Sequence, residues 1–329
     1  MSGASLPAYS DYVSEHNLAS ERGPAPRRRW PYLLAAATGL VLIVAPIALG
    51  MFTRAAQGQL MLSSFAPYMS QEQITSFRND LTVISAARAN VTSLQSTGQA
   101  PAGRYQYVDG FVRDYPAIDA DLNTTLDAVQ ANLGNYQRLT ALPPFGSIPW
   151  LFVLPGAVLL GAGVLGARKA LHGTPSPIAR GVIGLTGIAL IAAPLALGLF
   201  ADAPAGSQLV DGFTPVLTRD HVRQLQGYFV TLVGGQGELD SRYTKAVRVE
   251  HPEADLSAID ALASRWQPMT SEFAGFVGAM SDNVENFDGV VALRDSTRPL
   301  GFDAFHGIGW FFVVSGVLAL AAAYPGGKK

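Results

Sequence analysis

The chain contains no cysteine and few charged residues for its length. Without cysteine, disulfide bonds, thioether-linked haem and cysteine-ligated zinc are excluded. Charged residues make up 15% of the 329 residues and hydrophobic residues 49%, which is more apolar than an ordinary soluble protein. The five histidines lie in no triad or metal-binding pattern. We therefore expect no enzymatic activity, no cofactor and no metal site.

Acidic and basic residues are absent from four long stretches. Each stretch is close to the roughly 20 residues that a helix needs to cross the hydrocarbon core of a membrane. They predict four transmembrane helices, at residues 30–52, 149–167, 181–201 and 306–324. Because proton relays and charged-substrate pathways need ionisable groups within the membrane, a channel or transporter is the least expected function.

Basic residues flank these stretches on one side only. They cluster at residues 27–29, 168–180 and 328–329. Short loops rich in Lys and Arg stay in the cytoplasm. We therefore expect a multi-pass plasma-membrane protein with both termini and the 168–180 link in the cytoplasm. Residues 1–29 have few large apolar side chains and are expected to be a disordered tail, and residues 325–329 a short second tail.

One apolar segment occurs twice. LIVAPIALGMF, residues 42–52, returns as LIAAPLALGLF, residues 190–200, with an offset of 148 and eight of eleven positions identical. The similarity continues beyond the apolar segment, so we predict a tandem repeat of span, outer domain and span. Each unit crosses the membrane twice, so the copies share one orientation and are related by a pseudo-twofold axis along the membrane normal.

Aromatic residues and prolines recur where the predicted spans meet the outer domains. Aromatic side chains at this level anchor helices at the membrane interface, or they frame a groove that admits a lipid tail or a protein partner. The candidate partner or lipid interface consists of Phe65, Pro67, Trp150, Phe213, Pro215 and Trp310.

Two prolines lie within the repeated apolar segment. Pro46 and Pro194 each remove an intrahelical hydrogen bond and predict helix kinks, as fixed bends or as moving gates. Small residues such as Gly161, Gly166 and Gly187 favour close helix packing, either within the chain or in a homo-oligomer.

The two outer segments, residues 53–148 and 202–305, have apolar residues at helical spacing. Ser70 followed by Gln73 predicts a capping box at the start of one helix. Each segment is expected to form an antiparallel helical hairpin that cannot bury its apolar face alone. The link between the arms of the first hairpin, residues 96–116, contains glycine, proline and charged residues and is expected to be a loop at the distal tip. The predicted fold is an all-α membrane protein whose extracytoplasmic hairpins pack as a four-helix bundle.

Extensive helical surfaces without catalytic residues favour a non-enzymatic scaffold or accessory subunit of a bacterial cell-envelope complex. Its partners would be membrane lipids and an unidentified envelope protein. The alternative is an extracytoplasmic sensor, or a membrane protein that binds a lipid or small molecule. Nucleic acid is not expected as a partner, because the sequence has no basic patch with interleaved aromatic residues.

Overall fold

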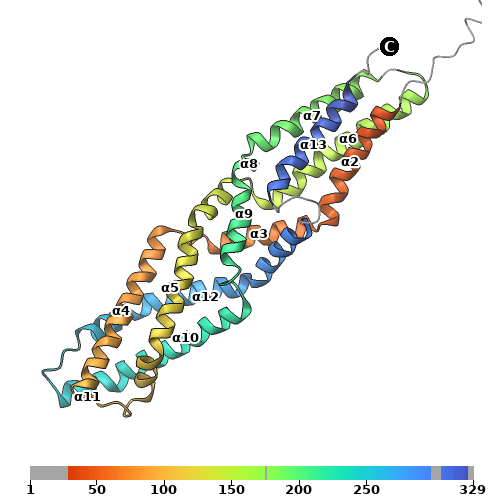
Figure 1. The fold of residues 1–329 in the computed structure, drawn as a ribbon. Coiled ribbons are helices and arrows are strands. Elements are labelled where there is room, and N and C mark those ends of the chain that lie inside the picture. Colours follow the sequence, from red (N-terminus) through yellow and green to blue (C-terminus); the bar gives the residue numbers. More distant parts are fainter. Residues whose placement is uncertain (1–28, 175, 298–304, 325–329) are drawn as a thin grey trace, which may run out of the picture. The chain divides into compact units, whose positions relative to one another are not determined.

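The computed structural model describes residues 29–174, 176–297 and 305–324. These residues form helices and turns and contain no strand, which confirms the predicted all-α fold class (Figure 1). The predicted N-terminal tail, apart from Arg29, and the tail at 325–329 lie outside the described residues.

The chain divides into two compact units. The first unit contains the described residues up to Ala48, the segment Trp150–Ala196 and the described residues from Gly309 onward. The second unit contains Leu49–Pro149 and the described residues of Leu197–Ile308. Three helical stretches, all wholly or largely in the first unit, are long and apolar enough to span a membrane, namely Trp30–Ala48, Phe145–Leu171 and Pro177–Ala196. The fourth predicted span coincides with a shorter apolar helix, Gly307–Ala323, so its crossing of the membrane stays a prediction.

The first unit is built from four helices that pack through small residues. They are α2 (Trp30–Ala48), α6 (Ile148–Leu171), α7 (Pro177–Ala196) and α13 (His306–Ala323), of which α6 and α13 begin in the second unit. A Cβ added at Gly39 of α2 would lie 2.5 Å from the backbone oxygen of Gly156 in α6. A Cβ added at Gly187 of α7 would lie 3.0 Å from the backbone oxygen of Gly316 in α13. Backbones approach so closely only where side chains are missing.

Aromatic and glycine contacts complete this packing. The rings of Phe152 in α6 and Phe312 in α13 stack with their centroids 4.3 Å apart, and both side chains are buried. Gly166 packs against the ring of Tyr32, as its small size predicts. No described neighbour lies within 4 Å of a Cβ added at Gly161, so it makes no close contact within the described chain, and a homo-oligomer contact there stays a prediction.

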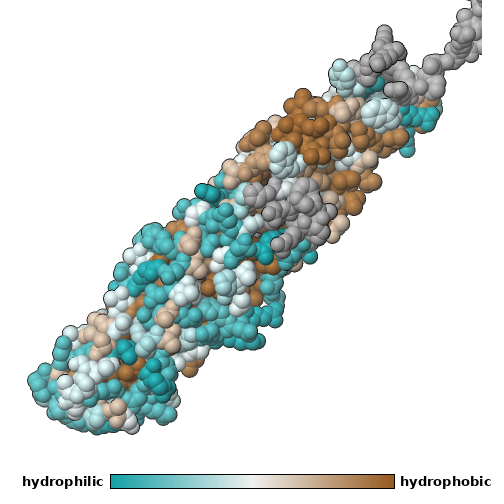
Figure 2. All heavy atoms as spheres, viewed as in Figure 1, coloured by the Kyte–Doolittle hydropathy of each residue, from teal (hydrophilic) through white to brown (hydrophobic). Residues whose placement is uncertain are grey.

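The outward surface of these helices is apolar. Each of the four helices has large apolar side chains that are between 44% and 70% exposed, for example Leu40, Val158, Leu185 and Val317. Figure 2 shows hydrophobic residues gathered over α2, α6, α7 and α13, whereas hydrophilic residues dominate the visible surface of the second unit. Such a surface is suited to contact with lipid tails, which explains why apolar residues face outward here.

The second unit contains two helical hairpins whose helices contact each other around an apolar core. The first hairpin consists of α4 (Gln71–Ser96) and α5 (Gln106–Ala141), the second of α10 (Arg219–Glu238) and α12 (Ser257–Thr297). Helix α4 also contacts α12, and α5 also contacts α10, so every helix touches one of the other hairpin. The π-helical turn η2 (Leu239–Tyr243) and α11 (Thr244–Glu250) extend α10.

Two shorter segments follow the repeated apolar segment in the chain. Helix α3 (Met51–Phe65) contacts α12, and α9 (Pro204–Phe213), which follows the short α8 (Leu199–Asp202), contacts α5. Each short helix therefore packs on the long helix of the other hairpin. This exchange means that neither half of the second unit can bury its core without the other half.

Helix boundaries reflect local sequence signals. The side chain of Ser70 accepts the backbone N–H of Gln73 at 3.1 Å, and that of Thr218 caps His221 in the same way. In a complete capping box the side chain of Gln73 would also bond to the backbone N–H of Ser70. The described contacts do not include this bond, because the side-chain amide of Gln73 donates to Glu272 at 2.9 Å.

Some predicted boundaries differ from those in the structure. Helix α2 ends at Ala48 and not at residue 52, because Gly50 adopts a left-handed backbone with φ of 61°. Gly198 does the same after α7, with φ of 68°. Helix α5 begins at Gln106 and continues through Pro116, where the sequence had suggested a loop.

Candidate functional site

The second unit contains an apolar cavity that we call the α3–α9 cavity. Its empty volume, which includes space open to solvent, is about 740 Å³. It lies among α3, the end of α5, η1 (Phe145–Ser147), α8, α9 and the end of α12. Its lining includes Met51, Arg54, Ala55, Gly58, Met61, Leu62, Leu139, Leu142, Phe145, Leu199, Ala203, Gly206, Leu209, Val210, Val290, Leu293, Phe305 and Ile308.

The lining residues come in pairs along the sequence. Ten of them form five pairs whose members are 148 residues apart, the offset of the repeated apolar segment. Such pairing places the cavity where the two halves of the unit meet and gives both sides similar chemistry. The five pairs are Met51 and Leu199, Ala55 and Ala203, Gly58 and Gly206, Met61 and Leu209, and Leu62 and Val210.

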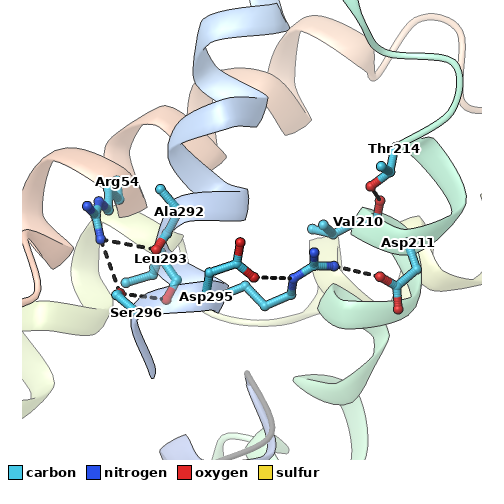
Figure 3. A network of polar contacts seen from close by, with 9 residues as sticks. Arg54, Val210, Asp211, Thr214, Ala292, Leu293, Asp295 and Ser296 are labelled. Carbon is cyan, nitrogen blue, oxygen red and sulfur yellow. Dashed lines mark hydrogen bonds and ion pairs between the residues drawn. The ribbon is translucent and has the colours of Figure 1, made fainter. Parts of the chain in front are cut away.

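Arg54 breaks this symmetry. It is the one charged side chain among the described residues that line the cavity, and the residue 148 positions later, Asp202, does not line it. Its Nη1 atom donates to the backbone oxygen of Ala292 at 3.4 Å and to the hydroxyl of Ser296 at 3.2 Å (Figure 3). It also donates to the backbone oxygen of Leu49 at 3.1 Å. These three groups hold one side of the guanidinium group in place.

The acidic residues near this position have another basic partner. Asp211 of α9 accepts a bond from Arg294 of α12 at 2.5 Å, and Asp295 lies 3.4 Å from the same side chain (Figure 3). In the described parts of the chain no carboxylate forms an ion pair with Arg54. Among the described residues, the groups bonded to the Arg54 guanidinium are neutral oxygen atoms.

A smaller cavity, of about 310 Å³ including space open to solvent, shares Met61, Leu62 and Leu209 with the α3–α9 cavity. Two predicted interface residues, Phe65 and Phe213, line it together although they are 148 residues apart. The structure thus brings this predicted pair into one place.

The other predicted interface residues are surface residues. Pro67 and Pro215 are exposed in the second unit, and Trp150 and Trp310 are exposed in the first, by 51% and 57%. Their role as an interface stays a prediction.

Both predicted kink residues lie close to the ends of their helices. Pro46 is buried in the last turn of α2 and Pro194 in the last turn of α7. The helices end two residues later, before the left-handed glycines Gly50 and Gly198. Each proline lacks the N–H that would bond within its helix, so the kinks stay a prediction, and each helix ends before a left-handed glycine.

A third cavity, of about 600 Å³ including space open to solvent, lies among α4, α5, α10 and α12. Its wall includes the aromatic residues Phe77, Phe229 and Trp266, and the buried Asp80 also lines it. Asp80 accepts a bond from Arg265 at 2.7 Å. Burial raises the pKa of Asp80 despite this partner, and the nearby Glu272 adds to the rise.

The described residues place no group of three or more His, Asp or Glu side chains suited to a metal ion. Comparisons of the chain with protein-family models, with curated protein sequences and with solved structures return no match. The functional interpretation therefore depends on the geometry of the cavities.

The sequence singled out Phe65 and Phe213, whose role as an interface stays a prediction, and it did not indicate Arg54 or the α3–α9 cavity. Arg54 follows an apolar stretch and looks like one of many basic residues beside a membrane segment. The sequence offered one signal. The residue 148 positions after Arg54 is Asp202, so a basic residue in the first copy of the segment corresponds to an acidic residue in the second.

Proposed function

We propose that the protein is a membrane-anchored receptor or carrier that binds an apolar ligand, such as a lipid chain, in the α3–α9 cavity. The observation that carries this proposal is the cavity itself, whose lining is apolar apart from Arg54. Apolar pockets with a small number of fixed polar groups are typical of small-molecule binding sites. The cavity therefore favours the lipid- or ligand-binding alternative over the scaffold function. The scaffold function stays a prediction.

The proposal includes the finer architecture predicted from sequence. We infer four membrane spans arranged as a tandem repeat, with the helical hairpins outside the plasma membrane and both termini in the cytoplasm. Repeated geometry supports the duplication, because Gly39 and Gly187 are 148 residues apart and each packs on a glycine of the following apolar helix. The left-handed Gly50 and Gly198 have the same spacing.

The cavity lies close in sequence to the predicted membrane boundary. Met51, Ile148, Leu199 and Ile308 line it, and each is at most two residues from a point where the chain passes between the two units. A lipid chain leaving the membrane would therefore have a short route to the cavity.

Filling the cavity tests the proposal. A Cβ added at Gly58 would meet Phe145 at 3.4 Å and Val290 at 3.5 Å, so a small adjustment admits a side chain whose outer atoms occupy the cavity. We expect Gly58→Leu, purified from the native host in mild detergent, to retain its helical circular dichroism spectrum. The amount of lipid that co-purifies with it, measured by mass spectrometry, should be at least about tenfold lower than for the wild type.

The matched control is Gly227→Leu, which changes a helical glycine with no neighbour within 4 Å of its added Cβ. This variant should carry as much lipid as the wild type. Equal lipid content in the wild type and in folded Gly58→Leu would exclude the α3–α9 cavity as the binding site.

A further inference from the structure

The described residues of the first unit carry positive charge and no negative charge. Their Arg and Lys side chains are Arg29, Arg168, Lys169 and Arg180, and they include no Asp or Glu. Arg29 immediately precedes α2, Arg168 and Lys169 lie in the last turn of α6, and Arg180 lies near the start of α7. No carboxylate among the described residues of this unit therefore balances these charges.

The three helix ends that carry these residues meet around one buried ring, that of Tyr32 in α2. A Cβ added at Gly166 of α6 would collide with this ring. The guanidinium carbon of Arg180 lies 5.7 Å from the centroid of the same ring, within reach of a cation–π contact. Arg29 and Arg168 are each within one helical turn of Tyr32 or Gly166 in sequence. The basic residues therefore gather at one end of the first unit, where α2 and α7 begin and α6 ends (Figure 1).

Exposed apolar side chains lie beside this basic cluster. Leu33 of α2, Leu165 of α6 and Ile178 of α7 are more than half exposed, and each is within one helical turn of a basic residue in sequence. The three helices are also the ones that are long and apolar enough to span a membrane. A cationic rim beside an apolar surface matches an amphiphile that has an anionic head and long acyl chains.

Arg180 is the basic residue whose position neither membrane insertion nor the helix dipole explains. Basic residues can set the orientation of a span without adopting a defined conformation. Arg168 and Lys169 are favoured by the dipole at the C-terminal end of α6. Arg180 lies at the opposite end of a helix, where the dipole disfavours a cation, and its side chain is half-buried and held near Tyr32. A bound anion would offset this unfavourable interaction.

We propose that this basic cluster binds an anionic phospholipid, with the lipid phosphate on the guanidinium group of Arg180 and the acyl chains along the exposed apolar side chains. The planar fork of arginine suits a phosphate group, and Arg168 and Lys169 add positive charge nearby. A zwitterionic lipid would bring its own cationic group to a cluster that is already positive, so an anionic lipid is preferred. The inference concerns the first unit and does not depend on the ligand of the α3–α9 cavity.

The test compares phosphatidylglycerol with phosphatidylcholine that has the same acyl chains. The full-length protein is reconstituted in nanodiscs that contain both lipids, because detergent competes for an exposed surface, and the retained lipids are counted by native mass spectrometry. We expect the wild type to bind phosphatidylglycerol at least about tenfold more tightly than phosphatidylcholine. Arg180→Gln should lower this preference by about fivefold, since one basic residue near an anionic lipid contributes about that factor.

Two further variants separate a lipid site from a general effect of charge. Lys245→Gln removes an exposed positive charge from α11 in the second unit and should keep the full preference. Arg180→Lys keeps the charge without the planar fork and should keep part of the preference. Circular dichroism should show the same helix content for all variants, so that a loss of binding is not a loss of fold.

The outcomes separate this inference from the proposed function. Equal retention of both lipids by the wild type would overturn the inference, and so would an equal loss of preference in Arg180→Gln and Lys245→Gln. Gly58→Leu should keep the preference for phosphatidylglycerol. If Gly58→Leu abolished it, the anionic lipid would occupy the α3–α9 cavity and the basic cluster would not be its site. If Arg180→Gln lowers the preference but Gly58→Leu retains all its co-purifying lipid, this inference holds and the proposed function fails.

Discussion

Glu238 in α10 accepts a hydrogen bond from the backbone N–H of Val108 in α5 at 3.1 Å, although the two residues are 130 positions apart. The same carboxylate oxygen accepts the N–H of Tyr107 at 2.7 Å, and the other oxygen pairs with Arg242. Tyr105 provides no side-chain cap for α5, so Glu238 satisfies its first free N–H groups from another helix. A carboxylate is also stabilised by the helix dipole at this end.

Replacing this carboxylate should weaken the second unit. Burial by itself raises the pKa of Glu238, but the bonds from Arg242, Val108 and Tyr107 outweigh it, so the pKa lies below its ordinary value. We expect Glu238→Gln to cost about 2 kcal/mol, since it weakens hydrogen bonds to a charged group. At neutral pH this should lower Tm, followed by circular dichroism, by about 4–8 °C.

The pH dependence follows from the direction of this shift. A depressed carboxyl pKa stabilises the fold above the unfolded-state pKa, and that contribution is lost as pH falls through the folded-state pKa. The difference between wild type and Glu238→Gln should therefore shrink in acid. Glu285→Gln is the control, because Glu285 forms an exposed ion pair with Arg219 and should change Tm little. A constant difference at all pH values would show that the charge of Glu238 is not the cause.

One substitution should have different effects at two buried tyrosines. The hydroxyl of Tyr115 donates to the backbone oxygen of Leu81 at 2.8 Å and lies 3.1 Å from Asp119. The hydroxyl of Tyr243 has no hydrogen-bond partner among the described residues, and burial raises its pKa to about 12. We expect Tyr115→Phe to cost about 1–2 kcal/mol, and Tyr243→Phe to be neutral or stabilising. Thermal unfolding of both variants measures this contrast, and equal losses would contradict it.

The glycine contacts of the first unit predict strong size limits. Valine at Gly39 would place its Cβ within 2.5 Å of the backbone of Gly156, so α2 and α6 would have to separate. We expect Gly39→Val to destabilise the detergent-solubilised protein by about 3 kcal/mol or more, as severe overpacking does. Gly161→Val is the control, because nothing lies within 4 Å of its added Cβ. The stability of both variants can be compared by tryptic digestion over a temperature series. If both were cleaved at similar temperatures, the contact between α2 and α6 would be wrong.

The proposed orientation can be measured directly, because the natural chain has no cysteine. Ser271 is exposed in α12 of the second unit, and Thr174 is exposed between α6 and α7. In intact cells, freed of any outer permeability barrier, a membrane-impermeant maleimide should label Ser271→Cys and leave Thr174→Cys unlabelled. Lysis should make both reactive. The reverse pattern would invert the predicted topology.

Local sequence patterns predicted the helices and several of their ends. Apolar spacing indicated the hairpins, and Ser70 marked the start of α4 because a hydroxyl cap acts on the next three residues. The loop expected before Pro116 was wrong, since packing and the cap from Glu238 keep α5 helical from Gln106. Cross-helix contacts of this kind have no local sequence signal.

The sequence by itself determined that this protein is helical and that its most apolar segments are long enough to cross a membrane, because helix propensity and hydropathy are local properties. It also contained the repeat that pairs Phe65 with Phe213. Tertiary structure alone decided that α3 packs on α12, that an apolar cavity remains among these helices, and that Arg54 bonds to Ala292 and Ser296 beside it. The two Arg54 bonds join residues 238 and 242 positions apart. Contacts of this kind depend on how side-chain volumes fit when the halves of the unit pack together.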